Sequence, residues 1–295
     1  MLYTGLRQTT MNIIECVRGI DVFKLLLSLF PLIFYSTVFK YYKQLRILTG
    51  LDKLIPPNYT ILSNIEHTLF FCHPHKLLSS LENPVFDCLA AIPYLFHFIL
   101  PFLFSVYLYI CPKRRPTLYS FLWCAGWVYI FAVLFQGTFP TAPPWFTDSA
   151  VFDEHGGVIF EVPNEAGFRR VDRMFGITLF HDIYSKNPVK FGSFPSLHTA
   201  LPTIVLFNHP WGGKMVGAIH VVWVILAALY STHHYLIDAI GGILLVVAVR
   251  LSMLRIWSPF PEPALDNREP NQQQGNGHLQ TSNHDQTTLT ADYIV

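Results

Sequence analysis

Long apolar stretches separated by short polar ones run along most of the chain, and they predict helices that cross a membrane. A membrane span needs roughly 20 mostly apolar residues, and five of the six apolar stretches approach that length while one is short. The six predicted spans are residues 22–42, 85–110, 117–135, 197–208, 215–231 and 235–254. A weaker apolar piece, residues 59–72, is interpreted as an interfacial or re-entrant helix. The pattern therefore predicts an all-α polytopic membrane protein, a bundle of six transmembrane helices.

The composition agrees with a membrane protein and excludes other classes. Of the 295 residues 52% are hydrophobic and only 13% are charged, whereas soluble domains are nearer a quarter charged. The net charge of +1 and the lack of a long basic run give no sign of nucleic-acid binding. The five cysteines have no disulfide or metal spacing. No cluster of metal ligands is evident, so neither a metal nor another cofactor is predicted, and no cleavable signal peptide is seen.

The polarity of the chain changes near residue 258. Residues 1–257 are predicted to form the membrane domain, and residues 258–295, rich in Asn, Gln, Ser and Thr, are predicted to form a disordered cytosolic tail. The last residues, 293–295, could add a strand to a peptide-binding domain through the free carboxylate. Most apolar C-termini bind no such partner, and that alternative is favoured.

The charges of the short loops predict the orientation. Residues 111–116, between the second and third spans, are compact and basic, so the positive-inside rule assigns them to the cytosol. Counting spans then assigns residues 137–195 and the corner at His233 and His234 to the lumenal or extracellular side. The glycosylation sequon at Asn58 falls on that same side. The long loop also carries cations, including Lys186 and Lys190, which could hold phosphate.

Two histidine segments carry the candidate chemistry. His234 and Asp238 lie four residues apart at the start of the sixth span, so the carboxylate can accept one ring N–H. The other ring nitrogen is then free to attack phosphorus. His198 lies in the first turn of the fourth span, where a helix start suits a phosphate and the imidazole can move a proton. The alternatives are a His–Asp pair that only stabilises a helix start and an interfacial histidine without a role. An ionisable pair in a membrane helix is functional by default, so we predict a phosphoryl-transfer site.

Other residues could support this site. Arg170, Arg173 and Ser196 are the candidates for holding phosphate oxygens, although the arginines could equally belong to a solvated charged turn. Residues 139–145, with three prolines and Trp145, predict a stiff interfacial loop. Asp87 could line the site. The remaining intramembrane histidines, His97 and His220, are interpreted as packed within the bundle.

Together these motifs resemble the type-2 phosphatidic acid phosphatase superfamily, and within it the fungal-type inositol phosphorylceramide synthases. The resemblance is carried by residues 139–145, 170–176, 192–198 and 233–241. It implies a six-helix bundle with a lumenal active site in the Golgi or another endomembrane. It also implies transfer of phosphoinositol from phosphatidylinositol, the phospholipid donor in the bilayer, to ceramide, with release of diacylglycerol and without a metal. In such enzymes the histidine at the place of His234 is the nucleophile, with Asp238 behind it and His198 as acid and base.

One departure favours a transferase over a phosphatase. Lipid phosphatases of the superfamily carry a Ser-Arg pair where this chain has Ala227 and Ala228. A phosphate monoester is dianionic and calls for several cationic donors, whereas a phosphodiester carries one charge and needs fewer. A lipid phosphate phosphatase of the same fold, with water as acceptor, is the first alternative. A non-catalytic membrane scaffold that presents its C-terminal tail is the second.

Overall fold

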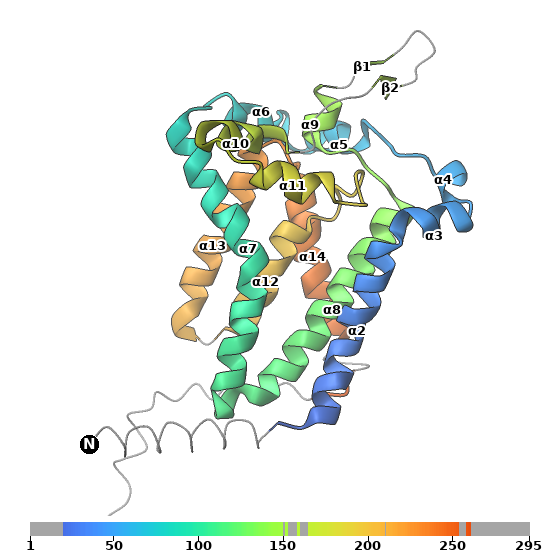
Figure 1. Ribbon diagram of the computed structural model, residues 1–295. Coiled ribbons are helices and arrows are strands. Elements are labelled where there is room, and N and C mark those ends of the chain that lie inside the picture. Colours follow the sequence, from blue (N-terminus) through green and yellow to red (C-terminus); the bar gives the residue numbers. More distant parts are fainter. Residues whose placement is uncertain are drawn as a thin grey trace, which may run out of the picture. The chain divides into compact units, whose positions relative to one another are not determined.

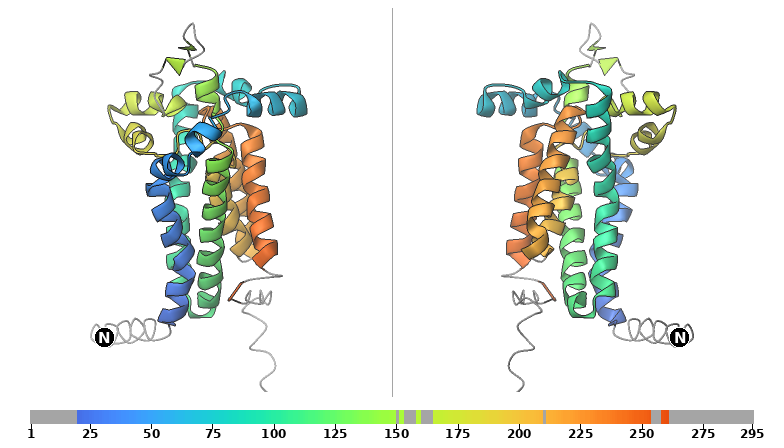
Figure 2. Two further views of the ribbon diagram at one scale, coloured as in Figure 1. Left: turned by 90° about the vertical axis from the view of Figure 1, so that its right-hand side faces the viewer. Right: turned by 90° about the vertical axis from the view of Figure 1, so that its left-hand side faces the viewer.

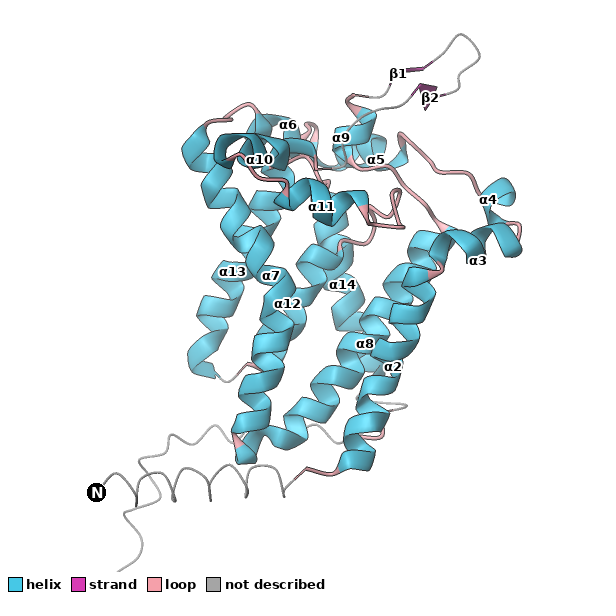
Figure 3. Ribbon diagram, in the orientation of Figure 1, coloured by secondary structure: helices cyan, strands magenta, loops and turns pink. Residues whose placement is uncertain are grey.

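The computed structural model describes residues 20–149, 151–152, 158–159, 165–209, 211–253 and 258–260, and these are overwhelmingly helical (Figures 1 and 3). The long helices are α2 (Val22–Lys40), α7 (Pro84–Ile110), α8 (Arg115–Thr138), α12 (Leu197–Asn208), α13 (Trp211–Tyr230) and α14 (Leu236–Ser252). The short ones are α3 (Tyr42–Leu48), α4 (Leu51–Leu54), α5 (Ile61–Phe70), α6 (Pro74–Ser79), η1 (Pro112–Arg114), α9 (Pro144–Thr147), η2 (Ala166–Phe168), α10 (Arg169–Phe175) and α11 (Leu179–Ser185). The two-residue strands β1 (Val151–Phe152) and β2 (Val158–Ile159) pair antiparallel.

A long helix lies at each of the six predicted spans. Four of them, α2, α7, α8 and α13, are long and apolar enough to cross a membrane. The other two are shorter, because α12 has 12 residues and α14 has 17. The structure therefore confirms an all-helical membrane architecture with four candidate spans.

Helix α8 is the centre of the bundle. In the most apolar part of this helix 72% of the residues are buried, against 11% in α2, which covers one side of it. Gly126 permits that contact, since a Cβ there would lie 2.6 Å from Cβ of Pro31 in α2. The main core joins α7, α8, α12 and α14, and includes Leu108, Phe121, Val128 and Ile204. The long apolar stretches therefore bury one another in the interior of the protein.

Short helices cover one end of the bundle. Helices α5, α6, α9, α10 and α11 gather there, at the end opposite the α7–α8 connection (Figures 1 and 2). We call these five short helices the cap. The weak apolar piece of the sequence contains α5, which lies in the cap rather than among the long helices. The basic residues Lys113 and Arg114 lie in the α7–α8 connection. The cap and these cations are therefore separated by the length of the bundle.

The chain still contacts the bundle just beyond the boundary predicted at residue 258. Phe260 is buried, and its ring packs on Tyr119 and Trp123 of α8. Most of the predicted tail, including residues 293–295, lies outside the described residues.

Candidate active site

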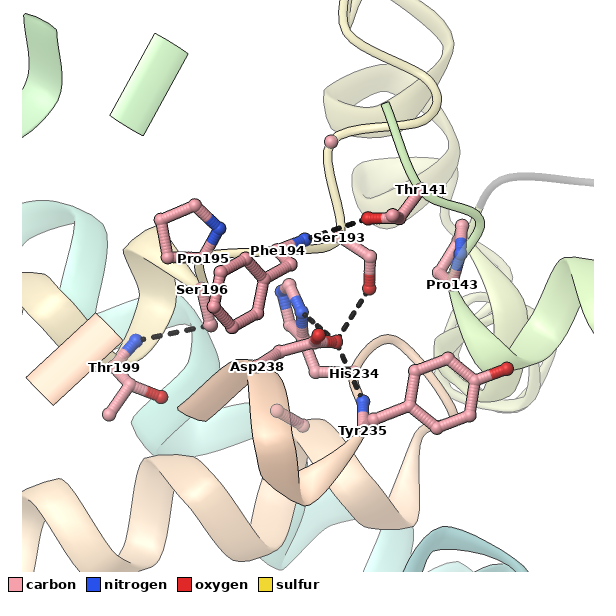
Figure 4. Close-up of polar contacts among 12 residues, drawn as sticks. Thr141, Pro143, Ser193, Phe194, Pro195, Ser196, Thr199, His234, Tyr235 and Asp238 are labelled. Carbon is pink, nitrogen blue, oxygen red and sulfur yellow. Dashed lines mark hydrogen bonds and ion pairs between the residues drawn. The ribbon is translucent and has the colours of Figure 1, made fainter. Parts of the chain in front are cut away.

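The turn before α14 builds a hydrogen-bonded centre around Asp238, which is fully buried. Its Oδ2 atom accepts from the Ser193 hydroxyl at 2.6 Å and from the Tyr235 backbone N–H at 2.9 Å (Figure 4). It also lies 3.2 Å from Nδ1 of His234. Because the ionised carboxylate only accepts, Nδ1 of His234 carries the proton. The lone pair on Nε2 of His234 is then available, and Nε2 has no hydrogen-bond partner among the described residues.

The start of α12 brings the second predicted histidine to the first. Ser196 caps this helix, its hydroxyl accepting from the Thr199 N–H, and its own N–H donates to the Asp238 carbonyl at 3.0 Å. The rings of His198 and His234 meet edge to face, with centroids 5.2 Å apart and an interplanar angle of 63°. The structure thus brings together His198, His234 and Asp238, while Ser196 lies fully buried beside them as a helix cap.

His97, interpreted from the sequence as a packed bundle residue, is part of this centre. It is fully buried in α7, and its Nε2 lies 2.6 Å from Nδ1 of His198. This contact fixes the orientation of the His198 ring and leaves Nε2 of His198 pointing to other partners. The two residues are 101 positions apart, so no local sequence signal could have paired them.

The glycines after Asp238 allow the two segments to approach. A Cβ on Gly242 would lie 2.4 Å from the Ser196 carbonyl oxygen, closer than real Cβ atoms come. A Cβ on Gly241 would meet the Phe194 ring at 2.2 Å. The close contact of α14 with the start of α12 therefore requires glycine at position 242, where the clash is with backbone, whereas at position 241 the Phe194 side chain would have to move.

The proline-rich segment 139–145 holds both histidine segments in place. The Thr141 N–H donates to Phe191 at 2.8 Å, and its carbonyl accepts from Ser193 at 3.3 Å. The Trp145 N–H donates to the Thr232 carbonyl at 2.9 Å, just before the histidines. The stiff loop predicted from the prolines thus connects the loop before α12 to the turn before α14.

A cavity of about 640 Å³ opens beside His198 and His234. His97, His198 and His234 line it together with Lys186 and apolar side chains. The apolar lining includes Leu32, Phe39, Phe98, Ile183, Val189, Leu197 and Leu201. A smaller hollow of about 70 Å³, lined by His198, His234, Lys190 and Trp145, adjoins the same rings. The site therefore combines three histidines, His97, His198 and His234, with two lysines and an apolar wall.

Arg170 and Arg173 line a different hollow, shared with Glu82 and Asp87, whose lining includes no histidine. Nε of Arg170 donates to Asp87 at 2.9 Å, and Nη1 lies 3.0 Å from Glu82. Partial burial opposes the charge of Arg170, but the hydrogen bond and the charge of Asp87 outweigh it and raise the pKa of the guanidinium. The structure does not bring these arginines to the histidines, and their role in phosphate binding stays a prediction.

A second histidine–carboxylate cluster lies in the cap and was missed in the sequence. Nδ1 of His75 lies 3.2 Å from Glu66, and its Nε2 lies 3.2 Å from Asp148. Burial opposes a charge on His75, but the hydrogen bonds to Asp148 and Glu66 raise the pKa of the imidazole above its ordinary value. His73 lies close by, 3.8 Å from Glu66. The sequence signal for this cluster is a Glu followed after six residues by His-Pro-His.

A family model and several known proteins match about two thirds of this chain. A family model described as the PAP2 superfamily matches residues 60–251. The chain is 31% identical over 195 residues to the inositol phosphorylceramide synthase catalytic subunit aur1 of Schizosaccharomyces pombe, covering 63% of this chain and 44% of that protein. It is 30% identical over 199 residues to the inositol phosphorylceramide synthase of Candida albicans, covering 64% of this chain and 40% of that protein.

A bacterial protein is also similar. The phosphoinositol dihydroceramide synthase of Bacteroides thetaiotaomicron is 33% identical over 213 residues, which cover 64% of this chain and 67% of that protein. The match spans less than half the length of the fungal relatives. No solved structure matches the chain.

Proposed function

Because the chain belongs to the PAP2 superfamily, we propose that it is a membrane phosphotransferase that moves phosphoinositol from phosphatidylinositol to ceramide. The products are inositol phosphorylceramide and diacylglycerol. The observation that carries the proposal is the adjacent pair His198 and His234, whose rings meet edge to face, with Asp238 bound to Nδ1 of His234. The names of the fungal and bacterial relatives support the choice of head group and acceptor.

In the first step, Nε2 of His234 attacks the phosphorus atom of the donor phosphodiester. The bond between phosphorus and the diacylglycerol oxygen breaks, and doubly protonated His198 gives its Nε2 proton to that oxygen. The negative charge of the phosphodiester favours this protonated form of His198. Asp238 accepts the Nδ1–H of His234 and stabilises the positive charge that develops on the ring.

In the second step, His198, now neutral, removes the proton from the primary hydroxyl of ceramide. The ceramide oxygen attacks phosphorus, and the bond to Nε2 of His234 breaks. Both histidines return to their starting protonation states. His97 is a positioning residue here, because its contact at 2.6 Å holds the His198 ring by Nδ1.

Lys186 and Lys190 supply the charge for the donor phosphate. They line the two hollows that adjoin the histidines, whereas Arg170 is bound to Asp87 elsewhere. A phosphodiester carries a single negative charge, so two flexible ammonium groups suffice to attract it. The apolar wall of the larger cavity suits lipid chains and disfavours water, which favours a lipid alcohol as acceptor.

We further propose six membrane spans and a lumenal site, in the Golgi or another endomembrane. The basic α7–α8 connection would be cytosolic by the positive-inside rule, and the cap lies at the other end of the bundle (Figure 1). Asn58, in the sequon, hydrogen-bonds to Pro140 close to the cap. Expression with microsomes should therefore give a glycosylated chain, and Asn58→Gln should remove the glycan. An unglycosylated wild-type chain would count against this orientation.

The function is tested by incubating detergent-solubilised protein with labelled ceramide and one donor at a time. Phosphatidylinositol, phosphatidylethanolamine and phosphatidylcholine are compared by lipid chromatography. A labelled ceramide product only with phosphatidylinositol is expected. A product with another donor would contradict the proposed head group. Phosphatidic acid is tested in a separate reaction, and release of phosphate from it, without a ceramide product from any donor, would favour the phosphatase alternative.

The scaffold alternative is tested by removing residues 264–295, a cut that keeps Phe260 in the core. An enzyme should keep most of its activity, because the histidines and both hollows lie within the remaining chain. Loss of cellular function with retained enzyme activity would instead favour a scaffold.

A further inference from the structure

The cap contains three metal-binding side chains gathered in ten residues of sequence. Glu66 is in α5, His73 precedes α6, and His75 lies in its first turn. One ligand atom from each lies within 4.8 Å of the others. Oε2 of Glu66 is 3.2 Å from Nδ1 of His75 and 3.8 Å from Nδ1 of His73. Glu66 and His75 are fully buried.

These side chains are close enough to share a zinc ion. Nitrogen and oxygen ligands about 2.0–2.1 Å from tetrahedral zinc lie about 3.3 Å from one another. The Glu66–His75 distance of 3.2 Å matches this value, and the Glu66–His73 distance of 3.8 Å is longer, so the His73 ring would close in on the ion. Two histidines and one carboxylate are a common zinc ligand set. We propose that Glu66, His73 and His75 bind a zinc ion, separately from the histidine pair of the phosphotransfer site.

The surroundings of the cluster are those of a metal site. A histidine that binds a metal usually donates its other ring N–H to a carboxylate, and Nε2 of His75 lies 3.2 Å from Asp148. The second oxygen of Glu66 is held by the Leu236 backbone N–H at 2.6 Å. Two of the three ligands are therefore already oriented by a further partner.

His73 is the residue that separates a metal site from a simple hydrogen-bond network. Glu66, His75 and Asp148 could bind one another through protons alone. Nδ1 of His73, in contrast, is buried and has no hydrogen-bond partner within the described residues. A metal at the centre of the cluster would give this nitrogen a partner, which a network of His75 and its carboxylates does not.

The zinc ion would have a structural role. Through Glu66 it would join α5 and α6 to Leu236, the first residue of α14. His75 also packs edge-on against the Tyr235 ring, with centroids 5.1 Å apart. The metal would thus hold the cap against the turn that carries His234, without touching the substrate.

The test uses the full-length chain with a tag that contains no histidine, purified in detergent. Elemental analysis should find about one zinc per chain, and cobalt substitution should give the absorption bands of a four-coordinate site. His73→Ala should lose the metal while keeping the fold. His181→Ala is the matched control, because His181 is exposed in α11, and it should keep the metal. Asp148→Asn should weaken zinc binding about 10–100-fold.

Thermal unfolding gives an independent readout. A chelator should lower the melting temperature of the wild type, and zinc but not magnesium should restore it. The same treatment should leave His73→Ala unchanged. Folded wild-type protein that holds no zinc and binds none when it is added would overturn the proposal. Equal zinc content in wild type and His73→Ala would overturn it as well.

Discussion

His234 with Asp238 and His75 with Glu66 are histidine–carboxylate pairs near the start of α14, and they differ in what the second ring nitrogen does. His234 lies 3.2 Å from Asp238, and His75 lies 3.2 Å from Glu66. The Nε2 of His75 is taken by Asp148, whereas the Nε2 of His234 has no partner among the described residues. Two pairs of the same chemistry and distance are therefore suited to different tasks. The first can attack a substrate, and the second can only hold the fold or a metal.

The residues around the two pairs also differ in charge. His234 lines cavities with His198, Lys186 and Lys190, so its surroundings can attract an anion and move a proton. His75 is fully buried between two carboxylates, which suits a cation. A short His–carboxylate distance is thus insufficient to identify a catalytic residue.

The largest effect is expected at His234. His234→Ala should lower ceramide product formation by about 10⁴-fold or more, because the nucleophile is removed. The melting temperature should fall less than in His75→Ala, because Asp238 keeps its hydrogen bonds from Ser193 and the Tyr235 N–H. The ceramide assay and thermal unfolding of the same preparation measure both. The exposed His181→Ala serves as the control. Substantial product from a folded His234→Ala protein would break the comparison, since His234 would then also be structural.

The opposite result is expected at His75. His75→Ala leaves Glu66 and Asp148 without their shared partner, and breaking such a buried pair should cost on the order of 3 kcal/mol of stability. Thermal unfolding measures the loss. The activity per folded molecule, measured at low temperature, should fall far less than in His234→Ala. An unchanged melting temperature would show that the cap pair does not stabilise the fold.

A smaller effect is expected at Lys190. Lys190→Ala should reduce kcat/KM for the phospholipid donor by about 10–100-fold, because one charge-assisted contact to phosphate is lost. Lys190→Arg should restore part of it. Arg173→Ala is the matched variant from the other hollow and should have little effect. A larger loss with Arg173→Ala would support the phosphate-binding role predicted from the sequence.

The smallest effect is expected at His97. His97→Leu removes the contact that orients His198 and should lower kcat by about tenfold. His97→Gln can still hydrogen-bond to Nδ1 of His198 and should recover much of the rate. Steady-state kinetics with both lipids measure the difference. Equal losses in the two variants would mean that His97 acts through packing and not through its ring nitrogen.

Much of the fold and the centre of the site could be predicted from the sequence. The long helices lie where the apolar stretches predict them, because a helix that crosses a membrane or is buried needs a continuous run of mostly apolar residues. His234 and Asp238 could be paired because they are four residues apart on one helix turn. The glycines and prolines near them also reflect local backbone demands, as Gly242 shows by its contact with Ser196.

Other parts depend on contacts that no local pattern encodes. The sequence by itself determined the apolar helices, the family and the pairing of His234 with Asp238, since each depends on residues near one another in the chain. Only the tertiary structure decided that His97 supports His198, that Lys190 rather than Arg170 lies beside the histidines, and that Glu66 reaches Leu236. The physical reason is that packing brings together groups more than 100 positions apart, such as the Glu66 carboxylate and the Leu236 backbone N–H, which are 170 positions apart.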